Sequence, residues 1–403
     1  MLNCRSCQSD NFQSIIPLGE MPLANALLKS SSVQNESRHN LEVMLCGDCG
    51  LAQLRDLIDP KELFSDYVYF SSNSDTMLRS AADLTKQVMK NIPDDALVME
   101  IASNDGYLLK NYIAKDINVL GIDPAQNIAK IANEAGINTL CDFFSKKLAD
   151  NLVQEDKKAD IIHANNVMAH VPDLNDFIQG IQVLLKPLGK AIIEVPYFLD
   201  LVKNNEFDTI YHEHVFYFAL RPLRLAFERH GLDIFDVEKL EIHGGSLRLF
   251  VGHKDARPVA TTIREVCVAE ELYGLAKFET FDKIKLGLHD LKVNLIDVLN
   301  QIKSEGGKIA AYGASAKGTT LLNYFGIGKE LLDFVVDRSP VKQGLYTPGT
   351  GLEICPVEDL ISKKATHALL LAWNFSEEIM AQQKDFIQQG GKFIRPLPTV
   401  EVL

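Results

Sequence analysis

The middle of the chain alternates short apolar runs with amphipathic segments. The apolar runs lie within 96–106, 117–125, 159–168 and 190–198, and turn residues bound each of them, as expected of buried strands. A shorter run at 137–141 predicts one further strand. Apolar residues recur at helical spacing within 107–115, 126–136 and 171–189, and the last of these helices is expected to end at Gly189. Strands that alternate with helices predict βαβ units and a parallel, doubly wound sheet.

The pattern changes beyond this region and then repeats. Residues 224–231 predict a helix, and 232–253 predict a pair of strands. The stretch from about Thr262 to Lys303 is amphipathic and is expected to be helical throughout. From 308 the α/β rhythm restarts, with strands expected within 308–318, 331–340 and 366–380 and a helix at 319–326. The sequence therefore predicts a second, smaller Rossmann-like unit.

Composition and charge narrow the class of protein. At about 150 residues per domain, 403 residues suggest two or three domains. No stretch approaches the ~18 apolar residues of a membrane-spanning helix, and the N-terminus lacks the features of a secretory signal. A net charge of −13 disfavours the basic surface that nucleic acids require. We expect a cytoplasmic protein without a membrane or nucleic-acid partner, and a monomer because no stretch is typical of a dimerisation element.

Four of the seven cysteines form two pairs near the N-terminus. Cys4 and Cys7 lie in CRSC, Cys46 and Cys49 lie in CGDC, and 38 residues separate the pairs. Two such pairs supply the four thiolates of a tetrahedral Zn²⁺ site, and four protein ligands make the site structural rather than catalytic. The alternative is a set of buried or redox-active thiols.

A turn between the first strand and the first helix of the central unit is the first candidate ligand site. It reads EIASNDG, from Glu100 to Gly106. Ligands of open parallel sheets bind beyond the carboxyl ends of the strands, and Asn104 tolerates the left-handed backbone that such a turn needs. Asp123 ends the next strand, 23 residues after Glu100, and suits the hydroxyls of an adenosine ribose. Taken singly, these residues also fit other nucleotide-binding folds or a helix-capping loop.

The densest polar cluster follows the fifth strand. Tyr211, His212, Glu213 and His214 are consecutive. In an extended conformation, Tyr211 and Glu213 share one face, and the two histidines share the other. Imidazole, carboxylate and phenol groups on one loop at the carboxyl side of the sheet favour proton transfer. A metal-binding cluster, or polar side chains bonded within the loop, are the alternatives.

Two glycine-containing motifs follow. Residues 243–248 read HGGSLR, a polar cluster that spacing alone does not separate from a plain hairpin. Residues 313–318 read GASAKG, where backbone N–H groups, a helix N-terminus and Lys317 predict a phosphate cradle. Asp337 ends the next strand, 24 residues after Gly313, and suits ribose hydroxyls. The alternative for Lys317 is a solvated lysine at the start of a helix.

Together these motifs resemble the sugar C-methyltransferase family, whose members act on nucleotide-linked deoxysugars. The resemblance rests on CRSC…CGDC, MPLAN (21–25), YFSSNSDTM (69–77), EIASNDGYLL (100–109), NNVMAHVPDLNDF (165–177), EVPYF (194–198), DTIYHEHVFYF (208–218), HGGSLR (243–248) and AYGASAKGTTLLNYFG (311–326). It implies an α/β fold in three parts. These are an N-terminal Cys4 zinc module (1–68), a central class I methyltransferase-like Rossmann domain that binds S-adenosylmethionine (69–300), and a Rossmann-like domain that binds the nucleotide sugar (301–403).

The resemblance also implies roles for individual residues. The cofactor site would be lined by Glu100, Asn104, Gly106, Asp123, Asp142, Phe143 and Asn165. His214 would be the base beside the hexose, and the further catalytic candidates are Tyr211, Glu213, His243 and Tyr69. The nucleotide half of the substrate, expected to be dTDP or GDP, would be bound by Gly313, Ser315, Lys317 and Asp337. Lys317 would face the pyrophosphate.

The reaction that the resemblance implies is methylation at C3 of a nucleotide-linked 4-keto-6-deoxyhexose. The C4 carbonyl acidifies C3–H, His214 removes that proton with Glu213 orienting an imidazole, and Tyr211 or His243 stabilises the enolate oxygen. Three alternatives stay open. They are an O- or N-methyltransferase acting on a nucleotide sugar, an NAD-dependent enzyme that uses the GASAKG turn, and a zinc-ribbon interaction protein.

Overall fold

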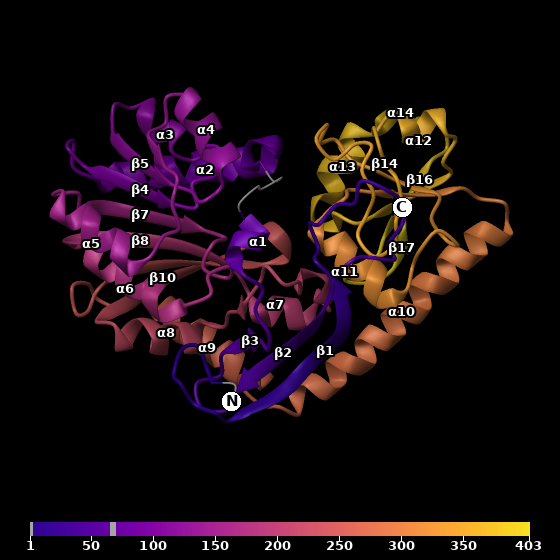
Figure 1. Ribbon diagram of the computed structural model, residues 1–403. Helices are drawn as coiled ribbons and strands as arrows, with labels where there is room; N and C mark the ends of the chain where they lie inside the picture. The colour runs from indigo at the N-terminus through magenta and orange to yellow at the C-terminus, as the bar shows by residue number, and fades with distance from the viewer. Residues whose placement is uncertain (1–2, 65–69) are drawn as a thin grey trace.

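Three sheets organise the molecule (Figure 1). The computed structural model describes residues 3–64 and 70–403. A seven-stranded sheet and a six-stranded sheet form two lobes, and a four-stranded sheet lies below and between them (Figure 1). Buried apolar side chains from all three sheets belong to one continuous core. The α/β class predicted from the sequence is confirmed.

The four-stranded sheet is antiparallel and contains one strand from the middle of the chain. Its order is β1 (Phe12–Pro22), β2 (Arg38–Cys46), β3 (Ala52–Leu54) and β9 (Phe216–Tyr217). β9 pairs with β3, so that Ala52 lies opposite Tyr217. β9 begins two residues after His214, so this pairing anchors the end of the YHEH loop (Tyr211–His214) to the N-terminal sheet.

In the seven-stranded sheet, β4, β5, β6, β7 and β8 are parallel to one another. β11 and β10 extend one edge as antiparallel strands. Its order is β10 (Leu232–Leu240), β11 (Ser246–His253), β8 (Leu185–Pro196), β7 (Ala159–Asn165), β4 (Leu97–Ile101), β5 (Asn118–Ile122) and β6 (Thr139–Leu140). The chain winds outward in both directions from β4 and β7, which leaves a crevice at their carboxyl ends. The associated helices are α1 (Pro60–Phe64), α2 (Asp75–Val88), α3 (Lys110–Ile113), α4 (Gln126–Glu134), α5 (Lys146–Gln154), α6 (Leu174–Leu184), α7 (Phe198–Lys203) and α8 (Leu220–Arg229).

The six-stranded sheet is parallel except for its last strand. Its order is β14 (Ile354–Cys355), β13 (Phe334–Val336), β12 (Ile309–Tyr312), β15 (His367–Leu370), β16 (Lys392–Arg395) and β17 (Glu401–Val402). Its helices are α11 (Ala316–Phe325), α12 (Asp359–Ser362), α13 (Ser376–Gln382) and α14 (Lys384–Gln388). Two α11 hydroxyls reach other parts of the chain: Thr319 Oγ1 donates to Ala24 O at 2.9 Å, and Thr320 Oγ1 donates to Ile210 O at 3.0 Å. These bonds fix α11 against the other two sheets.

Three predicted helices were wrong in extent. The helix expected to reach Gly189 ends at Leu184, and β8 begins at once, because Pro187 cannot donate a helical hydrogen bond. The long helix expected over 262–303 is divided into α9 (Thr261–Tyr273) and α10 (Thr280–Ser304), since Gly274 adopts a left-handed φ of 78° and ends α9. The helix expected over 107–115 is only α3, because the turn before it occupies the preceding residues. α10 then runs along the outside of the molecule to the C-terminal lobe (Figure 1).

Candidate functional site

A cavity of about 700 Å³ lies where the three parts of the chain meet. Its walls include the carboxyl ends of β4, β5 and β7, the YHEH loop, and the N-terminus of α11. Eleven of the residues singled out in the sequence line it: Asn104, Asp123, Phe143, Asn165, Tyr211, Glu213, His214, Gly313, Ser315, Lys317 and Asp337. The tertiary structure thus brings together candidates for cofactor binding, proton transfer and phosphate binding.

The turn after β4 is built on left-handed backbone. Ala102, Asn104 and Gly106 have φ values of 55°, 50° and 77°. Asp123 closes the turn, because its carboxylate accepts the N–H of Asn104 at 2.9 Å and that of Ala125 at 3.0 Å. Burial raises the pKa of Asp123, and these two backbone bonds oppose the rise. The result is a carboxylate held at the cavity wall beside a tight turn.

Three residues that were expected to line the cofactor site lie outside the cavity wall. Glu100 is buried beneath the turn, and neither of its carboxyl oxygens has a hydrogen-bond partner within the described part of the chain. Burial, together with the nearby charges of Asp123 and Asp105, raises the pKa of Glu100 well above its ordinary value. Gly106 is needed for space, since a Cβ there would lie 2.1 Å from Cδ1 of Ile137. Asp142 is exposed.

His214 is held by hydrogen bonds at both ring nitrogens. Nδ1 lies 2.8 Å from the carbonyl oxygen of Thr209, and Nε2 lies 2.8 Å from the hydroxyl of Tyr211. A carbonyl oxygen only accepts, so Nδ1 carries the proton and the Nε2 lone pair accepts from Tyr211. His214 is 7% exposed. Nε2 is therefore the nitrogen that can take up a proton.

The YHEH loop is not extended, so the expected division of its faces is wrong. The N–H of His214 donates to Tyr211 O at 2.9 Å, and this turn brings Tyr211, Glu213 and His214 to the cavity together. His212 points elsewhere and packs edge-on against His39, with ring centroids 5.8 Å apart. Burial lowers the pKa of His212 to about 4, which leaves it uncharged at neutral pH.

Glu213 does not orient His214, because both imidazole nitrogens have other partners. Its carboxylate accepts instead from Asn25 Nδ2 at 2.6 Å. Burial raises the pKa of Glu213 to about 7, against the opposing effects of the Asn25 bond and the Lys342 charge. Glu213 thus changes its protonation near neutral pH.

Asn25, His170 and Lys342 also line the cavity, and none of them was assigned a role from the sequence. The His170 ring meets that of His214 edge-on, with centroids 4.8 Å apart, and burial lowers its pKa to about 4. Asn25 and His170 lie within the quoted MPLAN and NNVMAHVPDLNDF motifs, which is the signal that could have identified them. Nothing in the sequence around Lys342 indicates its place.

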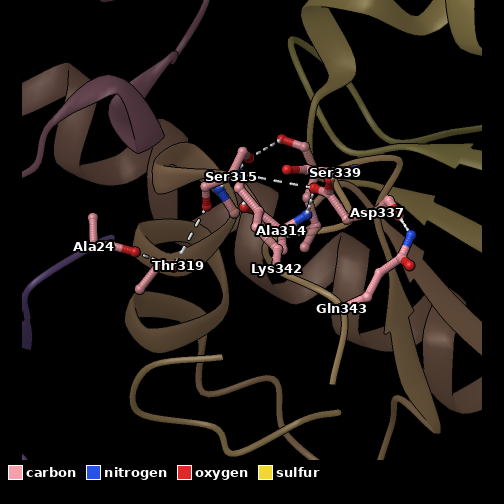
Figure 2. Close-up of polar contacts among 10 residues, drawn as sticks. Ala24, Ala314, Ser315, Thr319, Asp337, Ser339, Lys342 and Gln343 are labelled. Atoms are coloured by element: carbon pink, nitrogen blue, oxygen red, sulfur yellow. Dashed lines mark hydrogen bonds and ion pairs between the residues drawn. The ribbon is translucent and has the colours of Figure 1, made fainter. Parts of the chain in front are cut away.

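The C-terminal wall of the cavity is a polar turn closed by Asp337 (Figure 2). The Asp337 carboxylate accepts the N–H of Ala314 and the N–H of Ser339, each at 2.8 Å. Lys342 Nζ donates to Ala314 O at 2.8 Å and lies 3.8 Å from Asp337 Oδ2. Ser315 is the N-cap of α11, and its hydroxyl accepts the N–H of Gly318 at 3.1 Å. Asp337 and Lys342 thereby fix the turn that presents Lys317.

The two remaining catalytic candidates have no assigned contacts. Tyr69 lies outside the described residues. The backbone of His243 lies in the 3₁₀ turn η4 (Ile242–Gly244), between β10 and β11, and its side chain is also outside the described part. In the same motif, Arg248 forms a buried ion pair with Glu194 at 2.7 Å and a second pair with Glu238 at 2.9 Å. Arg248 therefore joins β8, β10 and β11 rather than lining the cavity.

The four N-terminal cysteines form a compact cluster. Their Sγ atoms all lie within 4.8 Å of one another, with Cys4–Cys49 at 3.6 Å and Cys7–Cys46 at 3.7 Å. Thiolates around a tetrahedral Zn²⁺ at ~2.3 Å are ~3.8 Å apart, so the residues fit this ion. The cluster is at the end of the four-stranded sheet, apart from the cavity residues.

Comparison with known proteins shows matches over all three parts of the chain. Residues 4–64 match the family described as "Putative zinc binding domain", 74–237 the family "Methyltransferase domain", and 241–398 the family "C-methyltransferase C-terminal domain". The chain is 33% identical to the C-methyltransferase NovU of Streptomyces niveus, over 99% of this chain and 96% of NovU. The chain belongs to this C-methyltransferase family.

Other relatives of this C-methyltransferase match only part of it. The ubiquinone biosynthesis O-methyltransferase of Bartonella tribocorum is 33% identical over 25% of this chain and 41% of its own length. Among solved structures, an S-adenosylmethionine-dependent methyltransferase from Clostridium acetobutylicum aligns over 45% of this chain and 94% of its own, with 17% identity and a TM-score of 0.35.

Family membership decides between the broad alternatives. The chain is an S-adenosylmethionine-dependent methyltransferase with a Cys4 zinc module, as predicted, and neither an NAD-dependent enzyme nor a zinc-ribbon interaction protein. No helix within residues 3–64 and 70–403 is long and apolar enough to cross a membrane.

Proposed function

We propose that this C-methyltransferase adds a methyl group to C3 of a nucleotide-linked 4-keto-6-deoxyhexose. The observation that supports it is that His214 and Tyr211 line the same cavity as two groups of residues that suit two different ligands. On one side Asn104, Asp123 and Phe143 suit S-adenosylmethionine, which supplies the methyl group when bound. On the other side, Ser315 and Lys317 suit the diphosphate of a nucleotide. The sugar then lies beside His214.

His214 is the proposed base for the proton on C3. Its Nε2 carries the available lone pair, because the bond from Nδ1 to Thr209 O fixes the tautomer. The C4 carbonyl of the substrate makes this proton acidic, and removal of the proton leaves an enolate. The enolate carbon is the nucleophile for methyl transfer.

Tyr211 is the proposed donor to the enolate oxygen. Its hydroxyl is hydrogen-bonded to His214 Nε2 at 2.8 Å. When substrate occupies the cavity, the hydroxyl exchanges this acceptor for the C4 oxygen, on which negative charge develops. The exchange also exposes the Nε2 lone pair to C3–H.

Burial stabilises the uncharged forms of the neighbouring groups. The pKa of His170 is lowered to about 4, and that of Glu213 is raised to about 7. Fewer fixed charges surround His214 than the residue types suggest. When Glu213 is protonated, it places no negative charge beside the developing enolate. Glu213 and Asn25 are proposed to bind the sugar hydroxyls.

The deciding experiment compares nucleotide-linked 4-keto-6-deoxyhexoses with their 4-hydroxy counterparts, using S-adenosylmethionine labelled with ¹³C in the methyl group. We expect label only in the products of the ketones, in a methyl carbon that ¹³C NMR shows to be bonded to C3 of the sugar. Label on oxygen or nitrogen, or equal turnover of the 4-hydroxy sugars, would contradict the proposal and indicate O- or N-methylation.

A further inference from the structure

The single tryptophan of the chain lies beside the proposed phosphate site. Trp373 is in the 3₁₀ turn η5 (Trp373–Phe375), and Nζ of Lys317 lies 4.6 Å from the centroid of its ring. Its neighbours Ala372 and Asn374 line the cavity. An ammonium group over an indole face is attracted by the ring quadrupole, more strongly where water is excluded. Trp373 is largely buried, so its ring helps to determine where the Lys317 charge is held.

The N–H group of the same indole is hydrogen-bonded to a buried carboxylate. Trp373 Nε1–H donates to Oδ2 of Asp208 at 2.7 Å, and Asp208 is fully buried. Burial raises the pKa of Asp208, while the Lys317 charge and the indole bond oppose the rise. Glu206 is a second buried carboxyl group that is influenced by the Lys317 charge. Carboxylate, indole and ammonium therefore form a series in which each group stabilises the next.

The ring contact suits a lysine that must also bind an anion. A cation–π contact uses none of the three N–H donors of an ammonium group, so it can hold Lys317 while those donors bind phosphate oxygens. A direct ion pair with Asp208 would compete with the phosphate for the same donors. The indole instead holds Lys317 in place without using the donors that bind phosphate.

The same series leads to the loop that carries the proposed base. Asp208 is in the 3₁₀ turn η3 (Phe207–Thr209), and Thr209 O accepts from His214 Nδ1. α11, which begins next to Lys317, also donates from Thr320 to Ile210 O at 3.0 Å. Lys317 and the YHEH loop are thus connected by two short routes.

We propose that Trp373 and Asp208 are positioning residues that hold the Lys317 ammonium at the diphosphate end of the cavity. This inference rests on the proposed function, in which Lys317 binds the diphosphate of a nucleotide sugar. Trp373 and Asp208 act through Lys317 and do not themselves contact the substrate.

The first test uses the fluorescence emission of Trp373, the single tryptophan among the 403 residues. The wild type is titrated with thymidine diphosphate, guanosine diphosphate or inorganic pyrophosphate. A saturable change in Trp373 fluorescence is expected, because phosphate that binds the Lys317 ammonium group alters its contact with the indole. Lys317→Met is expected to abolish the change. Binding measured by calorimetry with no change in emission would contradict a contact between Lys317 and Trp373 that responds to the ligand.

The second test measures Kd for the same diphosphates in Trp373→Phe, Trp373→Leu and Asp208→Asn. Loss of the ring contact is expected to raise Kd about 2- to 30-fold, with a larger effect for leucine than for phenylalanine. KM for the nucleotide sugar should rise with it, while kcat and the Kd for S-adenosylmethionine stay within about twofold of the wild type. Lys308→Met is the matched control, because Lys308 lies over the Phe334 ring at 5.7 Å and outside the cavity wall.

The outcomes separate this inference from the function on which it rests. Unchanged diphosphate Kd in all three variants would overturn the positioning role and leave the proposed function intact. A wild type that binds S-adenosylmethionine but neither nucleoside diphosphate nor pyrophosphate would overturn both. If Asp208→Asn does not fold, as judged by S-adenosylmethionine binding, the two Trp373 variants decide the question.

Discussion

A backbone carbonyl, not a side chain, sets the tautomer of His214, the proposed catalytic base. Thr209 O fixes the proton of His214 on Nδ1, and Tyr211 covers Nε2. The carboxylate next to His214 in sequence, Glu213, is bonded to Asn25 instead. Adjacent residue numbers within a turn therefore did not predict which groups act on each other.

The first prediction at this scale concerns His214. His214→Ala is expected to lower kcat about 10²- to 10⁴-fold, because proton removal loses its base. Hydrogen–deuterium exchange at C3 of the sugar, followed by NMR in D₂O without S-adenosylmethionine, should be lost as well. His289→Gln, which changes an exposed histidine on α10, serves as the control. Exchange at the wild-type rate in His214→Ala would assign the base to another residue.

The second prediction concerns the dependence of stability on pH. Burial raises the pKa of Glu213 from 4.5 to about 7 in the folded protein. Between these values the folded chain holds a proton that the unfolded chain has released, so stability is full below about pH 4.5 and falls as pH rises to about 7. Glu213→Gln should remove this loss. The free energy of unfolding of the variant relative to that of the wild type should therefore be about 1–3 kcal/mol higher at pH 8 than at pH 5.

Urea unfolding of the wild type and the variant at pH 5, 6, 7 and 8 measures this difference. Glu265→Gln, on the exposed face of α9, should leave the wild-type pH dependence unchanged. Parallel curves for the wild type and Glu213→Gln would contradict a buried, protonated Glu213.

At the scale of the element, the turn after β4 shows how space and backbone conformation act together. Gly106 has a φ of 77° and lies against Ile137, which follows α4. The turn can therefore pack against the neighbouring connection only without a side chain at this position. Ala102 and Asn104 adopt left-handed angles of their own, and the Asp123 carboxylate compensates by bonding the turn.

Gly106→Ala is expected to weaken S-adenosylmethionine binding at least ~10-fold and to destabilise the protein by about 1–3 kcal/mol. Gly136→Ala is the matched control, since Gly136 has a similar φ of 83° but no atom within 4 Å of an added Cβ. Calorimetry and thermal unfolding of both variants compare the clash with backbone strain alone. Equal effects in the two variants would show that the contact with Ile137 is unimportant.

At the scale of the whole molecule, the zinc module is connected to the cavity through a sheet. Cys46 ends β2, β2 pairs with β3, and β3 pairs with β9 just after His214. Asn25, between β1 and β2, donates to Glu213. A metal site that holds the first sheet together therefore also supports one wall of the cavity.

Removal of zinc is expected to lower methyl transfer at least ~10-fold while S-adenosylmethionine still binds the seven-stranded sheet. The reason is that structural zinc contributes about 10–16 kcal/mol to the order of such small segments. Cys46→Ser should have the same effect as a chelator, whereas Cys141→Ser, an exposed cysteine outside the cluster, should have none. Full activity in metal-free protein would contradict this coupling.

Local patterns were sufficient for most strands and helices of the two α/β units, for the four clustered cysteines and for the turns at 100–106 and 313–318. Each of these depends on residues close in sequence, where spacing, backbone tolerance and burial act directly. Local patterns did not predict the four-stranded sheet of β1, β2, β3 and β9. The same patterns extended the helix past Leu184, where Pro187 cannot continue the helix and β8 pairs with β7 instead, and they missed the break at the left-handed Gly274.

The tertiary structure alone decided which polar groups meet. The contacts of Glu213 with Asn25, of Trp373 with Asp208 and of Lys317 with Trp373 join residues separated by 188, 165 and 56 positions. The periodicity of apolar residues does not predict contacts between residues so far apart in sequence, because these contacts follow from how three sheets pack around one core. The amino-acid sequence determined which chemical groups are present, and the packing determined which pKa values shift and which groups act together.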